Sequence, residues 1–329
     1  WYKTYPTVIF TSLIVLYILL AGIGFSRRTS EKIKQSRFRH TETILTFLIS
    51  ITIVLSIGWT IKERDEIVNW KTFYQSSLSE INKITESTWD TRDYIFPSIA
   101  LFIENSEEVT NDEFINFTNK IITKKSFLNI NWAPKISSRE DIEKFLPPYL
   151  EIWQIDENGD KVPAKDTENL YPIFRCNSQN HFPSFIGLDI SSISHAKEAM
   201  ESALKTNRPS ATPPIKTPII NYKNPVILIV YPVIKNNQLE GFISAFVDLY
   251  SFVNESIFNE TVSLNKKLID LNLFQFNDKE TQKLLYTSKT QENYTSHEIP
   301  NIYDTSKIFF PILAFHQLYG AITEPSSEL

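Results

Sequence analysis

The chain is poor in cysteine and glycine. Its 329 residues include a single cysteine, Cys176, so an intrachain disulfide is impossible. A secreted eukaryotic domain of this size usually carries several cysteines, so a bacterial periplasmic or surface domain fits better. With only seven glycines, the sequence has no P-loop, GxGxxG or GxSxG motif, and no HExxH motif either. We therefore expect no catalytic residue and no cofactor.

Charge and histidine patterns exclude further classes. The net charge of −5 comes with scattered lysines and arginines, which is not the pattern of a nucleic-acid-binding protein. The five histidines are dispersed. His181 and His195 are the nearest to a metal-binding pair, but no carboxylate or cysteine cluster accompanies them. We expect no metal.

Two long apolar runs stand near the start of the chain. Residues 7–25 and 44–61 carry no charge, and each is long enough to cross a bilayer. The loop between them, residues 26–43, is basic and is expected on the cytoplasmic side. A signal peptide or a pair of buried soluble helices are the alternatives, and both fit such long charge-free runs poorly. We therefore predict transmembrane helices in 1–25 and 44–61, with the rest of the chain beyond the membrane.

A long helix is predicted after the second run. Apolar residues recur at helical spacing from Ile67 to Ile84, and no glycine interrupts residues 62–105. We predict a signalling helix there, with a break near Pro97. The residues Thr110 and Glu113 form a capping box that begins another helix.

The remainder alternates between helical and strand patterns. Asn158-Gly159 and Asn236-Asn237 predict hairpin turns, and Ser192 is expected to begin a helix. Four strand candidates end the chain, within residues 267–276, 283–288, 307–315 and 318–323. The fold class is α+β, with a mixed lobe over 106–262 and a smaller lobe over 263–329.

Four stretches of the sequence, in this order, resemble the CHASE domain, an extracellular input module of histidine kinases and nucleotide cyclases that includes the plant cytokinin receptors. The stretches are 130–145, 170–192, 196–214 and 226–249. The residues that match the family signature are Trp132, Pro134, Arg139, Phe145, Gly187, Asp189, Thr212, Tyr231, Pro232, Val233, Gly241 and Asp248.

The resemblance implies a membrane-distal PAS-like lobe that binds a small molecule, a membrane-proximal PAS-like lobe, and homodimerisation. It also implies a cytoplasmic output domain, a histidine kinase or diguanylate cyclase, which this chain lacks and which would act in cis or in trans. The expected location is the bacterial inner membrane, multi-pass, with the large domain periplasmic or extracellular.

The resemblance also nominates a ligand site. The position that holds the purine in cytokinin-binding relatives is Asn180 here, and bulky Phe246 follows the small residues of the pocket strand, so cytokinin itself is not expected. The ligand-binding candidates are Asn180, Thr212, Asp189, Phe174, Tyr231, Ser244 and Ala245. Three of them have a competing role in the fold, as a helix cap for Asp189 and as core aromatics for Phe174 and Tyr231. Thr212 and Asn180 rest on the resemblance alone.

Three functions remain after this reading. The first is the input module of a transmembrane receptor for a small organic ligand, whose output domain is not in this chain. The second is an accessory membrane subunit that uses a CHASE-like lobe to bind protein. The third, a membrane-tethered enzyme, has no motif to support it. We expect the first.

Overall fold

The computed structural model describes residues 14, 17–18, 41–137, 151–165, 169–178, 185–215, 222–257, 269–276, 282–287, 308–315 and 317–325. The chain divides into two units, Trp1–Gln75 and Ser76–Leu329. Among the described residues, no helix combines the length and apolar character needed to cross a membrane. The first expected span lies almost wholly outside the described residues, and the second lies within helix α2 (Thr41–Asp90). Neither span is confirmed.

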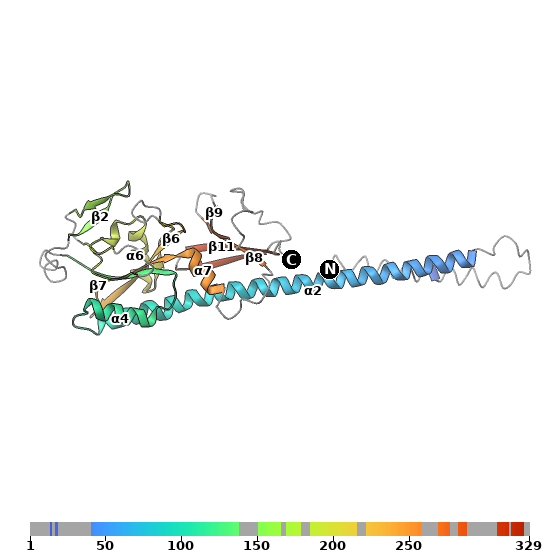
Figure 1. Ribbon diagram of the computed structural model, residues 1–329, viewed down its shortest axis with the longest axis horizontal. Helices are drawn as coiled ribbons and strands as arrows, with labels where there is room; N and C mark the ends of the chain where they lie inside the picture. Colours follow the sequence, from blue (N-terminus) through green and yellow to red (C-terminus); the bar gives the residue numbers. More distant parts are fainter. Residues whose placement is uncertain are drawn as a thin grey trace, which may run out of the picture. The chain divides into compact units, whose positions relative to one another are not determined.

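The predicted long helix and its break are both present. Helix α2 passes directly into a π-helical turn, Thr91–Ile95, and then into helix α3, Phe96–Glu104 (Figure 1). Pro97 stands in the first turn of α3. Because proline has no amide hydrogen and its ring crowds the preceding turn, the helix changes its hydrogen-bond pattern just before it.

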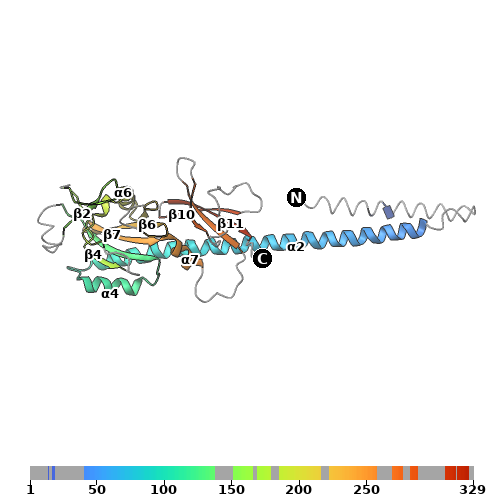
Figure 2. The same cartoon turned by 45° about the horizontal axis from the view of Figure 1, so that its top comes forward.

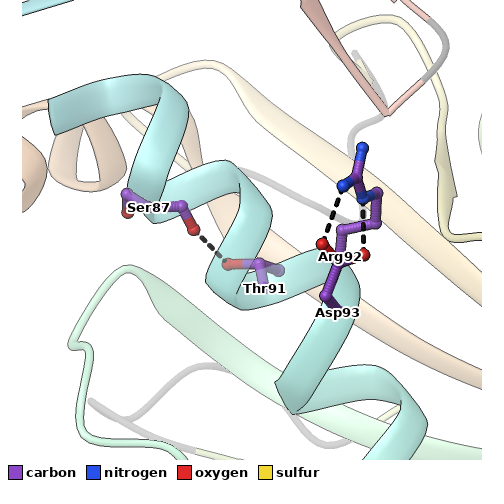
Figure 3. A network of polar contacts seen from close by, with 4 residues as sticks. All are labelled: Ser87, Thr91, Arg92 and Asp93. Atoms are coloured by element: carbon purple, nitrogen blue, oxygen red, sulfur yellow. Dashed lines mark hydrogen bonds and ion pairs between the residues drawn. The ribbon is translucent and has the colours of Figure 1, made fainter. Parts of the chain in front are cut away.

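Polar side chains bridge the π-helical turn (Figure 3). Thr91 donates its hydroxyl to the carbonyl of Ser87 at 2.9 Å, and Arg92 pairs with Asp93 through two hydrogen bonds of 2.7 Å. The Arg92 guanidinium holds the pKa of Asp93 below its usual value.

Helix α4, Asn111–Ile121, begins at the predicted capping box. The hydroxyl of Thr110 accepts from the amide of Glu113 at 3.3 Å, and the Glu113 carboxylate accepts from the amide of Thr110 at 3.0 Å. The Thr110 hydroxyl also donates to the Glu113 carboxylate at 2.7 Å, and the bonds from the amide and the hydroxyl of Thr110 hold the pKa of Glu113 below its usual value.

A five-stranded antiparallel sheet forms the centre of the second unit, in the order β4-β1-β7-β6-β5. Its strands are β1 (Phe127–Pro134), β4 (Arg175–Ser178), β5 (Ser210–Ala211), β6 (Val226–Lys235) and β7 (Gln238–Asp248). The β6–β7 hairpin turns at Asn236 and Asn237, which both have positive φ, 53° and 62°. Asparagine tolerates this conformation, as the sequence predicts. The hairpin of β2 (Trp153–Ile155) and β3 (Lys161–Pro163) likewise turns at the predicted Asn158-Gly159.

The two faces of this sheet are covered by different helices (Figures 1 and 2). We call them the α3 face, against α3 and α4, and the α6 face, against helix α6 (Ala196–Thr206). The core on the α3 face includes Ile130, Trp132, Ile243 and Ala245. The core on the α6 face includes Leu128, Phe242, Phe246 and Val230. Alternate residues of each strand thus serve opposite faces.

Helix α6 begins later than the sequence predicts. Ser192 ends a 3-10 turn, Ile190–Ser192, whose N-cap is Asp189. His195 then adopts a left-handed conformation with φ of 60°, and the α-helix starts at Ala196. Because a left-handed residue interrupts the helical path, the turn and the helix are separate elements.

A second, four-stranded antiparallel sheet follows helix α7 (Leu249–Ile257). Its order is β10-β11-β8-β9, from β8 (Ile269–Phe276), β9 (Gln282–Thr287), β10 (Ile308–Ala314) and β11 (Gln317–Pro325). These are the four strands expected from the sequence. Their buried side chains join those of the α3 face in one apolar cluster, which also includes Ile81 and Ile84 of α2. The division into lobes at residue 262 stays a prediction.

Candidate functional site

The α6 face carries a polar row that the α3 face lacks. In the register of the sheet, Asn131 of β1 stands opposite Cys176 of β4 and Ser244 of β7. Ser244 in turn stands opposite Val230 of β6, and Val230 opposite Ser210 of β5. Directly opposite residues of antiparallel strands point to the same face. All five are buried, and three of them, Asn131, Ser244 and Ser210, are polar side chains beneath the elements that cover this face.

Two asparagines of this face are incompletely satisfied. The side-chain oxygen of Asn129 accepts from the amide of Phe246 at 3.1 Å and from the side-chain nitrogen of Asn131 at 3.2 Å. That nitrogen also donates to the Ser244 hydroxyl at 3.4 Å. The nitrogen of Asn129 and the oxygen of Asn131 have no partner, although both residues are 0% exposed. A buried polar group without a partner costs about 1–3 kcal/mol, so these two atoms mark a place where stability is given up.

The sequence candidates Ser244 and Ala245 do not share a face. Neighbouring residues of a strand point in opposite directions, and Ala245 belongs to the core of the α3 face while Ser244 joins the polar row. Phe246 returns to the α6 face, where its ring centroid lies 5.4 Å from that of Phe185. Ser244 and Ala245 therefore cannot line one pocket on this sheet.

Phe174 and Tyr231 also pack against the core of the α3 face. The Arg175 guanidinium lies 3.8 Å from the centre of the Phe174 ring, and the Tyr231 ring lies 6.4 Å from that of Phe96 on α3. Burial raises the pKa of Tyr231. These contacts are those of core aromatics, the competing role that the sequence left open.

Thr212 and Asp189 are engaged by the fold. The Thr212 hydroxyl accepts from the amide of Leu228 at 3.1 Å, and the Thr212 amide donates to the Leu228 carbonyl at 2.9 Å. Thr212 thereby extends the pairing of β5 with β6. Asp189 is fully buried, and its carboxylate accepts four hydrogen bonds. The donors are the amides of Tyr171 and Ser191, the Ser191 hydroxyl and the side chain of Gln154. Its capping role is present, and it leaves little capacity for a ligand.

Close packing explains several signature residues. A Cβ at Gly241 would lie 2.3 Å from the carbonyl oxygen of Ala133 and 2.8 Å from the Trp132 ring, and Gly241 stands opposite Pro134. Only glycine allows β7 to approach β1 so closely. Gly187 has φ of 83°, and a Cβ there would meet the Glu151 carbonyl at 2.5 Å.

Pro232 fits β6 for a reason of hydrogen bonding. Leu228 exchanges hydrogen bonds with Thr212 on the β5 side, so the even-numbered residues of β6 direct their backbone groups to that side. The pairing of β5 with β6 ends at Val230. The missing amide hydrogen of Pro232 therefore leaves no residue of β5 without a hydrogen bond. Asn180, Arg139, Phe145, His181 and Phe182 lie outside the described residues.

A small cavity lies between α2, α7 and the second sheet. It has a volume of about 30 Å³ and is lined by apolar side chains, Ile84 and Phe252 among them. Organic ligands need cavities of about 300–1,000 Å³. The hydroxyl of Tyr319, which also lines it, has no hydrogen-bond partner, and burial raises its pKa. Among the described residues, no group of His, Cys, Asp and Glu could hold a metal ion.

The sequence reasoning missed Asn129 and Asn131. The pattern Asn-Ile-Asn-Trp shows polar and apolar residues alternating along one strand, which indicates a strand with one polar face. Such a face usually meets solvent. Its complete burial depends on the covering segments, which arrive from residues far along the chain.

Comparisons with known proteins bear on this arrangement. A profile of the CHASE domain matches residues 107–286, more than half of the chain. A comparison with curated protein sequences finds no match.

Several of the solved structures that match this chain are of chemoreceptor proteins. A structure described as methyl-accepting chemotaxis protein X is 12% identical, with 80% of this chain and 100% of that chain covered and a TM-score of 0.46. The periplasmic sensory domain of a Campylobacter jejuni chemoreceptor is 11% identical, with 81% and 96% covered and a TM-score of 0.44. The ligand-binding domain of a Pseudomonas aeruginosa amino-acid chemoreceptor, in complex with GABA, is 12% identical, with 76% and 99% covered and a TM-score of 0.39.

The matched segment begins before helix α4 and ends in β9, so it contains the whole five-stranded sheet and both of its faces. The chain belongs to the CHASE domain family of sensory input modules.

Proposed function

We propose that the chain is the sensory input part of a membrane receptor and that it binds a small organic ligand against the α6 face. The observation that carries this proposal is the pair of buried amide atoms without partners on Asn129 and Asn131. Buried polar groups without partners are uncommon in folded proteins and concentrate where a ligand or water completes them. Among the described residues of the five strands, the α3 face has no polar side-chain atom without a partner, and its core is apolar.

Hydrogen bonds connect the segment before β1 to α2 and to α7, and they support transmission of a signal from the sheet to α2. The Lys124 ammonium donates to the Ser87 hydroxyl of α2 at 2.6 Å. The next two amides, of Lys125 and Ser126, donate to the Glu255 carboxylate of α7 at 2.9 and 3.1 Å. The segment that enters β1 thus ties α2 to α7. Burial lowers the pKa of Lys124, so its bond to Ser87 lies in a partly dry environment where polar contacts are stronger.

Under this proposal, ligand binding changes the population of two arrangements of the sheet and α2. The apolar runs 7–25 and 44–61 anchor the chain in a bacterial inner membrane, with the CHASE region periplasmic or extracellular. The signal passes to a cytoplasmic kinase or cyclase domain, in cis or in trans, from a homodimer of the sensor.

The test is ligand-dependent thermal stabilisation of the full chain, purified in detergent micelles, across a broad set of neutral and charged metabolites. A ligand present at 100 times its Kd stabilises the folded state by about 2.7 kcal/mol. For a unit of this size the expected rise in Tm is about 5 °C or more.

The contrary result is a folded chain whose Tm responds to no metabolite. Co-purification of a membrane protein complex under those conditions would instead favour the accessory-subunit function, in which the CHASE region binds protein.

A further inference from the structure

The two amide atoms without partners differ in kind. The nitrogen of Asn129 is a donor, and the oxygen of Asn131 is an acceptor. Residues two apart on a strand are about 6.5–7 Å apart and project from the same face. Asn131 also fixes its neighbour, because its own nitrogen donates to Asn129. The face therefore holds one donor and one acceptor without partners, on side chains whose other amide atoms are hydrogen-bonded.

Charge on this side of the sheet is already compensated. Asp189 accepts four hydrogen bonds, as described above. Asp248, at the end of β7, accepts from the side chain of Asn224 at 2.9 Å and from the Ser251 hydroxyl at 2.6 Å. Among the described residues that are buried, none is a lysine or an arginine. A buried charge needs a partner of opposite sign, and the described residues supply none for a charged ligand.

Resting on the function proposed above, we propose that Asn129 and Asn131 bind a neutral planar group that carries an acceptor and a donor together, a carboxamide or a lactam. The carbonyl of the ligand accepts from the Asn129 nitrogen, and the N–H of the ligand donates to the Asn131 oxygen. A carboxylate has no donor for Asn131, and a ketone has none either. Recognition thus discriminates the amide from its closest isosteres, because the wrong ligand leaves the Asn131 oxygen buried and unpaired.

The first experiment compares three probes of the same shape on the full chain: benzamide, benzoate and acetophenone. At ten times its Kd, benzamide is expected to raise Tm by about 3 °C. Benzoate and acetophenone are expected to bind at least tenfold more weakly and to cause no resolvable shift at the same concentration. Equal shifts for all three probes, or a larger shift with benzoate, overturn the proposal.

The second experiment compares two asparagine variants. Asn131→Leu removes the acceptor and is expected to weaken benzamide binding at least tenfold. Asn177→Leu is the matched control, because Asn177 lies on the α3 face of neighbouring β4, where its nitrogen donates to Thr118 and Asn119 at 2.8 and 2.9 Å. Its benzamide response is expected to equal that of the unmodified chain. If both variants respond equally, the proposal is wrong. If Asn131→Leu does not fold, the three probes on the unmodified chain decide the matter.

The outcomes separate this inference from the function on which it rests. If other metabolites stabilise the chain and benzamide does not, the sensory function stands and the assignment of an amide ligand is wrong. If neither a metabolite nor an amide stabilises the chain, the sensory function and the amide assignment are both wrong. Asn129 and Asn131 then bind buried water alone.

Discussion

The two faces of the five-stranded sheet are made from the same strands and differ in what they do with polar atoms. On the α3 face, Asn177 is buried and its nitrogen has two partners. On the α6 face, Asn129 and Asn131 are buried more completely and each keeps an atom without a partner. Alternation along one strand thus lets β1 stabilise the fold with Ile130 and Trp132 while its asparagines point to the other side. Under the function proposed above, the α3 face contributes mainly stability and the α6 face adds recognition.

The largest expected effect is on the α3 face. Phe96 of α3 is 0% exposed and faces Tyr231, so Phe96→Ala leaves a cavity in the apolar core. We expect a loss of about 3–5 kcal/mol in the free energy of unfolding, measured by urea denaturation. A loss below about 1 kcal/mol would contradict the view that this face carries the stability.

The same substitution at the two asparagines is expected to cost different amounts of stability. Asn177→Leu removes two hydrogen bonds and leaves Asn119 without its donor, so we expect a loss of about 1–2 kcal/mol. Asn131→Leu removes an acceptor that has no partner together with two longer donated hydrogen bonds, to Asn129 at 3.2 Å and to Ser244 at 3.4 Å, so we expect a smaller loss, below about 1 kcal/mol. Urea denaturation of both variants gives the difference. If Asn131→Leu is the more destabilised of the two, the two faces do not differ as described.

The capping box of α4 gives a smaller effect on the α3 side. Thr110→Ala removes the hydroxyl that accepts from the Glu113 amide, and we expect a loss of about 1 kcal/mol. The response to benzamide should remain, because the cap lies on the opposite side of the sheet from the asparagines. Loss of that response would show that the faces are not independent.

The cap also predicts a weak pH dependence. Hydrogen bonds from the amide and hydroxyl of Thr110 lower the pKa of Glu113 in the folded chain. The stabilisation is therefore fully present above the unfolded pKa of glutamate, about 4.3, and is lost as the pH falls through the lower folded value. Other carboxyl groups with a lowered pKa, Asp93 among them, also lose stabilisation in acid. Thermal unfolding from pH 7 to pH 3 should therefore show a larger decrease in the unmodified chain than in Glu113→Gln. An equal decrease in both would exclude the cap as its source.

Local chemistry made much of the fold predictable. The turns at Asn158-Gly159 and Asn236-Asn237, the cap at Thr110 and the break at Pro97 each depend on neighbours in the sequence. The predicted start of α6 was wrong. Ser192 has a side chain that can cap a helix, but it ends a 3-10 turn whose N-cap is Asp189. A cap residue shows where a helix can begin and does not show which of two nearby turns is chosen.

The candidate site was less predictable from the sequence, because which side chains share a face depends on how the strands pair in the sheet. Ser244 and Ala245 were paired by position in the sequence, yet alternation separates them. Thr212 and Asp189 were nominated by resemblance, and both turn out to bind backbone groups of the fold. Asn129 and Asn131 became visible only when the register of β1 with β7 and the burial of both were known.

Hydrogen–deuterium exchange of the full chain, with and without a stabilising ligand, tests most directly whether recognition occurs on the α6 face. We predict that the ligand slows exchange in peptides from residues 185–206, which include α6, and leaves exchange in α4, residues 111–121, unchanged. Protection confined to α3 and α4 would contradict it, because the ligand would then lie on the face assigned to stability.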